Sequence, residues 1–293
     1  MAINAGDTAW VLASGALVLF MTPGLAIFYG GMVRAKSTLN MMMMSFAAMG
    51  VTTILWTLYA YSLSFGNDAS HGLIGNLKHV GLAGTISSVL GSPGHQIPML
   101  AFVMFQMTFA IITVALLSGA IADRAKFSAW LIFVIAWITV VYSPVAHWAF
   151  ASDGWISSKL HALDFAGGTV VEMNSGAAAL ALAIVLGKRE GFKRDRMRPH
   201  NMPLVLLGAG MLWFGWFGFN AGSALAANHT AALAMINTQI ATAAAVMSWV
   251  GYEKLREGKA TTLGAASGAI AGAVGITPAC GFIYPLGALI LGL

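Results

Sequence analysis

Two acidic residues, Asp164 and Glu172, lie in an otherwise apolar stretch that contains no Lys or Arg. Acidic groups at the depth of a membrane are costly to keep there, and they usually mark the path of a cation. The stretch continues to Gly187, which is long enough for a helix to cross the hydrocarbon layer. The eight-residue spacing would place the carboxylates about two helical turns apart on neighbouring faces. We therefore expect one acid near a pore entrance and the other deeper.

The composition indicates a membrane setting for these acids. Of the 293 residues, 58% are hydrophobic and 9% are charged, and the mean hydropathy is +0.80. These values exclude an ordinary soluble domain and predict an all-α polytopic membrane protein. The sequence contains no GxSxG, HExxH or phosphate-loop motif, and its histidines show no metal-ligand spacing. We expect no catalysis, no bound metal and no cofactor.

Long apolar runs predict eight full membrane crossings and a partial ninth, which begins at Ile283. The predicted crossings are Trp10–Tyr29, Met41–Phe65, Pro98–Ala122, Phe127–Phe150, Phe165–Gly187, Met202–Phe219, Thr230–Tyr252 and Leu263–Ala279.

The basic residues predict the orientation of these crossings. If the amino terminus lies outside, only Lys78 and Lys159 of the 15 Lys and Arg residues are exterior, and thirteen face the cytoplasm. The interior set is Arg34, Lys36, Arg124, Lys126, Lys188, Arg189, Lys193, Arg194, Arg196, Arg198, Lys254, Arg256 and Lys259. This bias accounts for the net charge of +5 without a nucleic-acid partner, and the run from Lys188 to Arg198 is simply explained as a topology signal near anionic lipid.

Seven ordered motifs closely resemble those of the ammonium transporter, methylammonium permease and Rhesus family. They are FYGGMVRAKSTLN (Phe28 to Asn40), FQMTFAIIT (Phe105 to Thr113), DRAKFSAWLIF (Asp123 to Phe133), LDFAGGTVV (Leu163 to Val171), WFGFNAGSA (Trp216 to Ala224), NTQIATAAA (Asn237 to Ala245) and SGAIAGAVGITPACGF (Ser267 to Phe282). The resemblance covers the chain from near residue 10 to its last residue.

The resemblance implies a single transmembrane domain over residues 1–293, built as two inverted halves. The first repeat would span about 8–188 and a partial second repeat about 200–293, because the chain ends before the helix that carries the family's second pore histidine. The family likeness also implies a homotrimer in a cell membrane, namely a bacterial inner membrane. A cytoplasmic nitrogen-regulatory protein is a further implied partner at the inner face.

The resemblance also assigns roles to individual residues. Phe109, Phe150 and Ser223 would recruit ammonium in an outer vestibule, and Phe109 and Phe219 would close the pore below it. Asp164 would organise the vestibule without necessarily touching the substrate. The lumen positions are Glu172, Trp216 and Thr277.

The residue types leave simpler interpretations open for three of these positions. Aromatic faces and hydroxyl oxygens suit the capture of a small cation. Taken alone, however, Phe109 is more often a lipid-facing or core residue, and Ser223 a packing or capping hydroxyl. Asp164 precedes a glycine pair at a predicted helix start, so its carboxylate could cap the free amide groups there. Capping and bracing are favoured over direct contact with the substrate.

Two substitutions depart from the family pattern. Glu172 stands where most members have the first pore histidine, and Phe150 stands where most bacterial relatives have Trp. Imidazole passes a proton between two nitrogens, whereas a desolvated carboxylate needs a cation or a donor to compensate it. We hypothesise that Glu172 relays protons or stabilises a cation and alters the pH dependence of conduction. The weaker π face of Phe150 predicts looser cation capture.

The sequence therefore predicts transport of ammonium or ammonia, and of methylammonium, through a hydrophobic pore in contact with membrane lipid. The alternatives are a non-conducting ammonium sensor and an incomplete fragment of a transporter.

Overall fold

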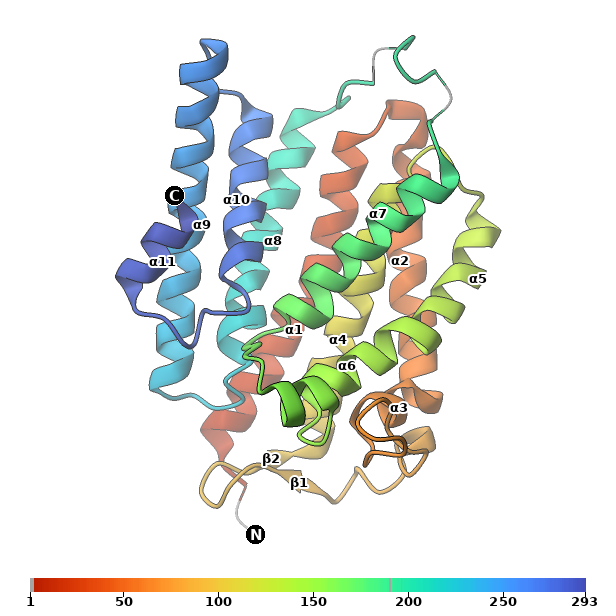
Figure 1. The fold of residues 1–293 in the computed structure, drawn as a ribbon, viewed down its shortest axis with the longest axis vertical. Coiled ribbons are helices and arrows are strands. Elements are labelled where there is room, and N and C mark those ends of the chain that lie inside the picture. Colours follow the sequence, from red (N-terminus) through yellow and green to blue (C-terminus); the bar gives the residue numbers. More distant parts are fainter. Residues whose placement is uncertain (1–2, 190, 196) are drawn as a thin grey trace.

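The protein is a bundle of helices in which segments far apart in the sequence run side by side (Figure 1). The computed structural model describes residues 3–189, 191–195 and 197–293. The α-helices are α1 (Ala5–Met32), α2 (Thr38–Leu55), α3 (Tyr61–Phe65), α4 (Met99–Leu117), α5 (Phe127–Trp137), α6 (Ser143–Phe150), α7 (Asn174–Leu186), α8 (Met202–Gly222), α9 (His229–Glu257), α10 (Thr262–Ile276) and α11 (Pro285–Gly292). A short antiparallel pair, β1 (Val89–Leu90) and β2 (Ile97–Pro98), lies in the connection between α3 and α4.

Seven helical segments in the described part of the chain are long and apolar enough to cross a membrane. They coincide with the first seven predicted crossings, although their ends differ by several residues. In two of them a π-helical turn joins consecutive α-helices, Trp56–Ala60 between α2 and α3 and Ile138–Tyr142 between α5 and α6. The structure and the sequence thus agree on a multi-pass helical membrane protein.

The eighth predicted crossing is shorter in the structure. α10 has 15 residues, so it is about 22 Å long at 1.5 Å per residue, less than the roughly 30 Å of a hydrocarbon core. The apolar tail that follows it forms α11, which has 8 residues. The number of full crossings beyond seven therefore stays a prediction.

Small residues allow the central helices to approach closely. α1 packs along α8 and beside α4, while α9, α10 and α11 form an adjacent group (Figure 1). A Cβ at Gly208 of α8 would lie 2.4 Å from the backbone nitrogen of Phe28 in α1, so only glycine fits there. Close contact through such small faces is how membrane helices associate, because lipid supplies no hydrophobic driving force between them.

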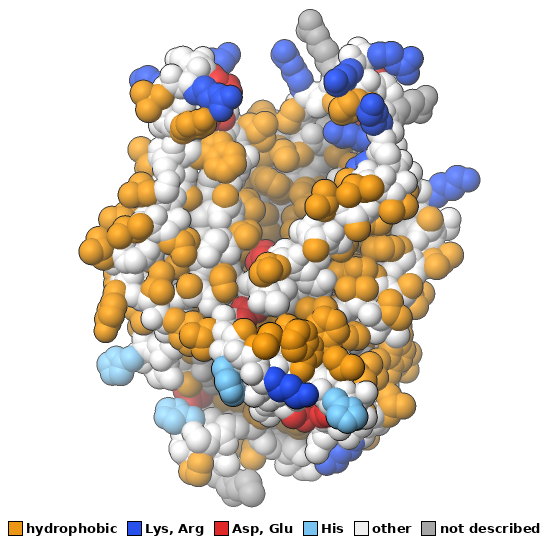
Figure 2. All heavy atoms as spheres, viewed as in Figure 1, with side chains coloured by type: hydrophobic (Ala, Val, Ile, Leu, Met, Phe, Trp, Pro, Cys, Tyr) orange, Lys and Arg blue, Asp and Glu red, His pale blue; other side chains and the backbone are white. Residues whose placement is uncertain are grey.

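Lys and Arg side chains gather at the end of the bundle opposite the N-terminus (Figure 2). The basic residues predicted to face the cytoplasm lie in four connections and at the end of α9. The connections are those from α1 to α2, α4 to α5, α7 to α8 and α9 to α10. Of that set, Arg196 lies outside the described residues. The orientation itself stays a prediction.

An ion pair joins two of the connections at this basic end. Arg34 donates from Nε and Nη2 to Oδ2 of Asp123, at 3.0 and 2.8 Å, and the Ser37 hydroxyl donates to Oδ1. Burial acts to raise the pKa of Asp123, but the hydrogen bonds from Ser37 and Arg34 outweigh it and lower that pKa below its usual range. Asp123 is therefore ionised at neutral pH, and the pair holds the α1–α2 turn against the end of α4.

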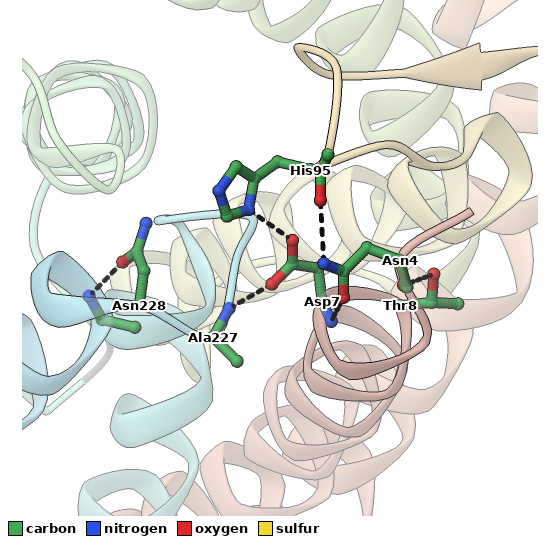
Figure 3. A network of polar contacts seen from close by, with 8 residues as sticks. Asn4, Asp7, Thr8, His95, Ala227 and Asn228 are labelled. Carbon is green, nitrogen blue, oxygen red and sulfur yellow. Dashed lines mark hydrogen bonds and ion pairs between the residues drawn. The ribbon is translucent and has the colours of Figure 1, made fainter. Parts of the chain in front are cut away.

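At the other end, Asp7 in the first turn of α1 joins three segments (Figure 3). Its Oδ2 lies 2.8 Å from Nδ1 of His95, which precedes β2, and its Oδ1 accepts a hydrogen bond of 2.8 Å from the N–H of Ala227, before α9. The Asn4 side chain caps the same helix by accepting from the N–H of Asp7. Asp7 is only 3% exposed, so these partners replace the water that its carboxylate has lost.

Candidate functional site

Asp164 lies just before a helix and not within one. Its Oδ1 accepts hydrogen bonds from the N–H groups of Gly167 and Gly168, at 2.9 and 2.7 Å, and its Oδ2 accepts from Thr169 at 2.8 Å. The helix begins at Gly168 with a π-helical turn. The expectation that Asp164 and Glu172 share one helix is therefore wrong, because the carboxylate is used to satisfy the free N–H groups of the helix start.

The turn after Asp164 packs tightly against aromatic rings on one side and a proline on the other. Gly167 has φ of 105°, a left-handed conformation that glycine adopts readily, and a Cβ there would lie 3.1 Å from the Phe150 ring and 3.6 Å from the Phe109 ring. A Cβ at Gly168 would lie 2.6 Å from Pro278, after α10. The glycine pair therefore brings the capped turn against α4, α6 and the end of α10.

Aromatic rings from three helices meet beside this turn. Phe109 of α4 and Phe219 of α8 have ring centroids 4.2 Å apart and planes inclined by 33°, and each residue is 1% exposed. Phe150, at the end of α6, meets Phe109 edge-on with a centroid separation of 6.4 Å. Phe105, one turn before Phe109, also packs edge-on at 4.9 Å. The structure thus brings together the three predicted phenylalanines and adds Phe105, which the sequence reasoning missed.

Ser223 lies at the end of α8 in a half-buried position. Its hydroxyl donates to the carbonyl oxygen of Phe219, one turn earlier, at 2.8 Å. This is the helix-end role that the residue type alone suggested. A hydroxyl oxygen that donates its proton in this way still has lone pairs with which it can accept from a cation.

Glu172 faces an internal cavity of about 60 Å³. The wall of this cavity includes Phe219 and Trp216 at one end and Tyr29 at the other, and Glu172 is the only acidic residue among its lining side chains. A cavity needs about 10–15 Å³ of such volume for one water molecule, so molecules the size of water or ammonia fit. Glu172 is half-buried, and its position on this wall agrees with the expected location deeper than Asp164.

Trp216 lines the cavity, whereas Thr277 holds Trp216 in place. The indole Nε1 donates to the Thr277 hydroxyl at 2.9 Å, and that hydroxyl donates to the carbonyl oxygen of Ala273 at 2.7 Å. Thr277 is fully buried and is not among the residues that line the cavity. Of the three predicted lumen positions, Glu172 and Trp216 line the cavity, whereas Thr277 braces Trp216 because its hydroxyl is used within the protein.

A larger cavity lies on the N-terminal side of the rings. It has a volume of about 450 Å³ and is lined by the aromatic rings of Phe65, Phe102 and Phe150, with Asn67 and Asp153 among its polar residues. The Phe65 ring lies 5.1 Å from Phe102 and 6.5 Å from Phe150, measured between centroids. We call this cavity the vestibule.

A third cavity, of about 370 Å³, lies at the basic end and shares Tyr29 with the cavity of Glu172. The Tyr29 hydroxyl donates to the carbonyl oxygen of Leu116 at 3.0 Å, which fixes the ring between the two spaces. Tyr29 was not predicted from the sequence, because the sequence of an apolar helix does not show which of its aromatic residues face a cavity.

The chain matches the family model described as Ammonium Transporter Family over residues 9–293. It is 57% identical to an ammonium transporter of Mycobacterium bovis over 310 residues, which cover 99% of this chain and only 65% of that relative. Mep2 of Candida albicans has a similar structure, with a TM-score of 0.90 and 36% identity over 99% of this chain and 64% of Mep2. A structure described as a sensor Amt protein gives a TM-score of 0.89 at 28% identity, over 98% of this chain and 72% of that one.

Proposed function

Since this chain belongs to the ammonium transporter family, we propose that it carries ammonium or ammonia, and also methylammonium, across a membrane. The observation that supports this most is the order of spaces along the bundle. Phe150 lines the vestibule and its ring meets Phe109, while Phe219, the ring paired with Phe109, lines the cavity that holds Glu172. A small cation enters from one side, and the rings exclude water and larger ions.

In this proposal the vestibule recruits the cation. The π faces of Phe150 and Phe109 attract it, and the Ser223 oxygen accepts one of its N–H groups. In this proposal Asp164 has a structural role, since its carboxylate accepts three backbone N–H groups at the start of the helix. It organises the vestibule by holding the turn that packs against Phe109 and Phe150.

Beyond the ring pair the substrate reaches Glu172. We propose that the cation transfers one proton to the Glu172 carboxylate and that neutral ammonia crosses the apolar cavity separately. The Glu172 carboxylic acid then returns the proton to ammonia, and the carboxylate stabilises the re-formed cation. Trp216, held by Thr277, shapes the wall on which this happens. The route then continues past Tyr29 into the cavity at the basic end.

Exchanging the ring at position 150 tests the recruitment step. We expect Phe150→Trp to lower the KM for methylammonium uptake into vesicles and Phe150→Leu to raise it. A change of about 1 kcal/mol in cation–π attraction corresponds to roughly fivefold in KM. The maximal rate stays nearly constant, because the ring pair and Glu172 are unaltered.

Phe214→Leu is the matched control for this test, since Phe214 lies on α8 and is 56% exposed. It is expected to keep the wild-type KM. Equal KM values for Phe150→Trp and Phe150→Leu would show that Phe150 does not belong to the recruitment site.

The similarity to the sensor Amt protein favours a second candidate function, in which the chain binds ammonium without conducting it. Such a protein would keep the vestibule and the ring pair. It would change its own stability on binding ammonium, and it would show no flux.

The setting of the protein is also proposed from the family. We propose a homotrimer in a bacterial inner membrane, surrounded by lipid, with the amino terminus outside. In this arrangement residues 8–188 form the first inverted repeat, and residues 200–293 form part of the second. A small cytoplasmic regulator of nitrogen metabolism would dock at the basic end, where the connections rich in Lys and Arg gather.

A further inference from the structure

His147 is fully buried beside the vestibule, and one of its ring nitrogens has no hydrogen-bond partner. Its Nδ1 lies 3.1 Å from the carbonyl oxygen of Ser64. A carbonyl can only accept, so Nδ1 carries the hydrogen. In the neutral ring Nε2 is then an acceptor with a free lone pair.

That lone pair points at two carboxylates. Nε2 lies 3.6 Å from Oδ1 of Asp68 and 3.9 Å from Oδ1 of Asp153. Both acids are held in place by backbone N–H groups, because Asp68 accepts from Ser70 at 3.0 Å and Oδ2 of Asp153 accepts from Asp68 at 2.8 Å. The hydrogen bond from Ser70 is the largest cause that lowers the pKa of Asp68, so this acid is ionised at neutral pH.

Three acceptor groups therefore lie close together, and Nε2 of His147 has no hydrogen-bond partner in the described part of the chain. The separations of 3.6 and 3.9 Å are too long for direct hydrogen bonds, so a proton on Nε2 would not be bonded directly to either carboxylate. One small cation with several N–H groups could donate to all three.

The cluster is open on the side from which substrate would arrive. The side chains of Asp68 and Asp153 are 26% and 44% exposed, whereas His147 lies behind them. Asp153 also lines the vestibule together with Phe150. A cation held at the two carboxylates would thus stand at the edge of the aromatic vestibule, before the ring pair.

We propose that Asp68, Asp153 and Nε2 of His147 form an outer docking site for ammonium, separate from the aromatic recruitment site formed by Phe109, Phe150 and Ser223. The substrate named here rests on the proposed function. The site raises the local concentration of the cation at the mouth of the vestibule, because two fixed negative charges at a partly enclosed rim attract small cations.

Asp153→Asn tests the site with little disturbance, since Asn keeps an oxygen for the Asp68 N–H and removes the charge. In vesicles we expect the KM for methylammonium to rise about fivefold with an unchanged maximal rate, the size of effect of one partly exposed ion pair. Asp153→Glu should restore most of the affinity. Glu257→Gln removes an exposed carboxylate in the last turn of α9, outside this site, and it should keep the wild-type KM.

A second measurement does not require transport. Ammonium chloride should raise the thermal midpoint of the detergent-purified wild type above the value in an equal concentration of sodium chloride, and this rise should be smaller for Asp153→Asn. If wild type shows this difference but no uptake, transport fails and the docking site stands. The docking site would be overturned by a wild-type KM in Asp153→Asn, or by an equal increase of KM in Glu257→Gln. It would also be overturned if ammonium raised the thermal midpoint equally in wild type and Asp153→Asn.

Discussion

Asp164→Ala is expected to destabilise the protein and to abolish transport in whatever fraction still folds. The carboxylate accepts from three backbone N–H groups at the start of a helix, and alanine leaves all three without a partner. The loss of a helix cap, which leaves N–H groups without acceptors, lowers the free energy of unfolding by about 2–4 kcal/mol. The thermal midpoint of the detergent-purified protein measures the stability, and methylammonium uptake per folded molecule measures the function.

Asp164→Asn is the informative companion to this variant. Its single side-chain oxygen can still accept from Gly167 and Gly168, but its amide would face the N–H of Thr169. We expect an intermediate loss of stability with a parallel loss of uptake. Normal stability with a selective rise in KM would instead show that Asp164 contacts the cation.

Glu172→Gln is expected to lower uptake by about a hundredfold, the lower end of what a positioned proton-transfer group contributes. Glutamine has nearly the same shape but cannot take up a proton, so the change isolates the acid from the packing. Glu172→His should retain uptake with a shifted pH profile, because imidazole accepts a proton in a different pH range from a carboxyl group. Uptake of labelled methylammonium across a pH series measures all three proteins.

Glu257→Gln is the matched control for this series, since Glu257 is exposed in the last turn of α9, at the basic end. It should reproduce the wild-type profile. Identical profiles for wild type, Glu172→Gln and Glu172→His would show that the carboxylate takes no part in conduction.

The membrane-spanning helices could be predicted from the sequence because the signal is strong and local. A run of about 20 apolar residues has few alternatives to a transmembrane helix, since its backbone must satisfy its own hydrogen bonds in lipid. The pairing of Phe109 with Phe219 depended on the family resemblance, because these residues lie in different helices. Apolar periodicity does not show which faces of two fully apolar helices meet.

The local backbone geometry and side-chain contacts of the site were harder to predict from the sequence than the helices. The eight-residue spacing wrongly placed Asp164 and Glu172 on one helix, whereas the glycine pair after Asp164 predicted the capping bonds that the structure has. The family resemblance placed Thr277 at the lumen, whereas in the structure its hydroxyl accepts from the Trp216 indole and braces that ring. The acceptor cluster at His147 could not be predicted from the sequence, because Asp68 lies 79 residues before His147 and 85 residues before Asp153.

The current evoked by ammonium across vesicles on a solid support, recorded for wild type and Glu172→Gln side by side, tests the central claim most directly. The account predicts a saturable current for wild type, carried by net movement of one positive charge per substrate, and a much smaller one for Glu172→Gln. A folded wild-type protein that binds ammonium and gives no current would contradict it.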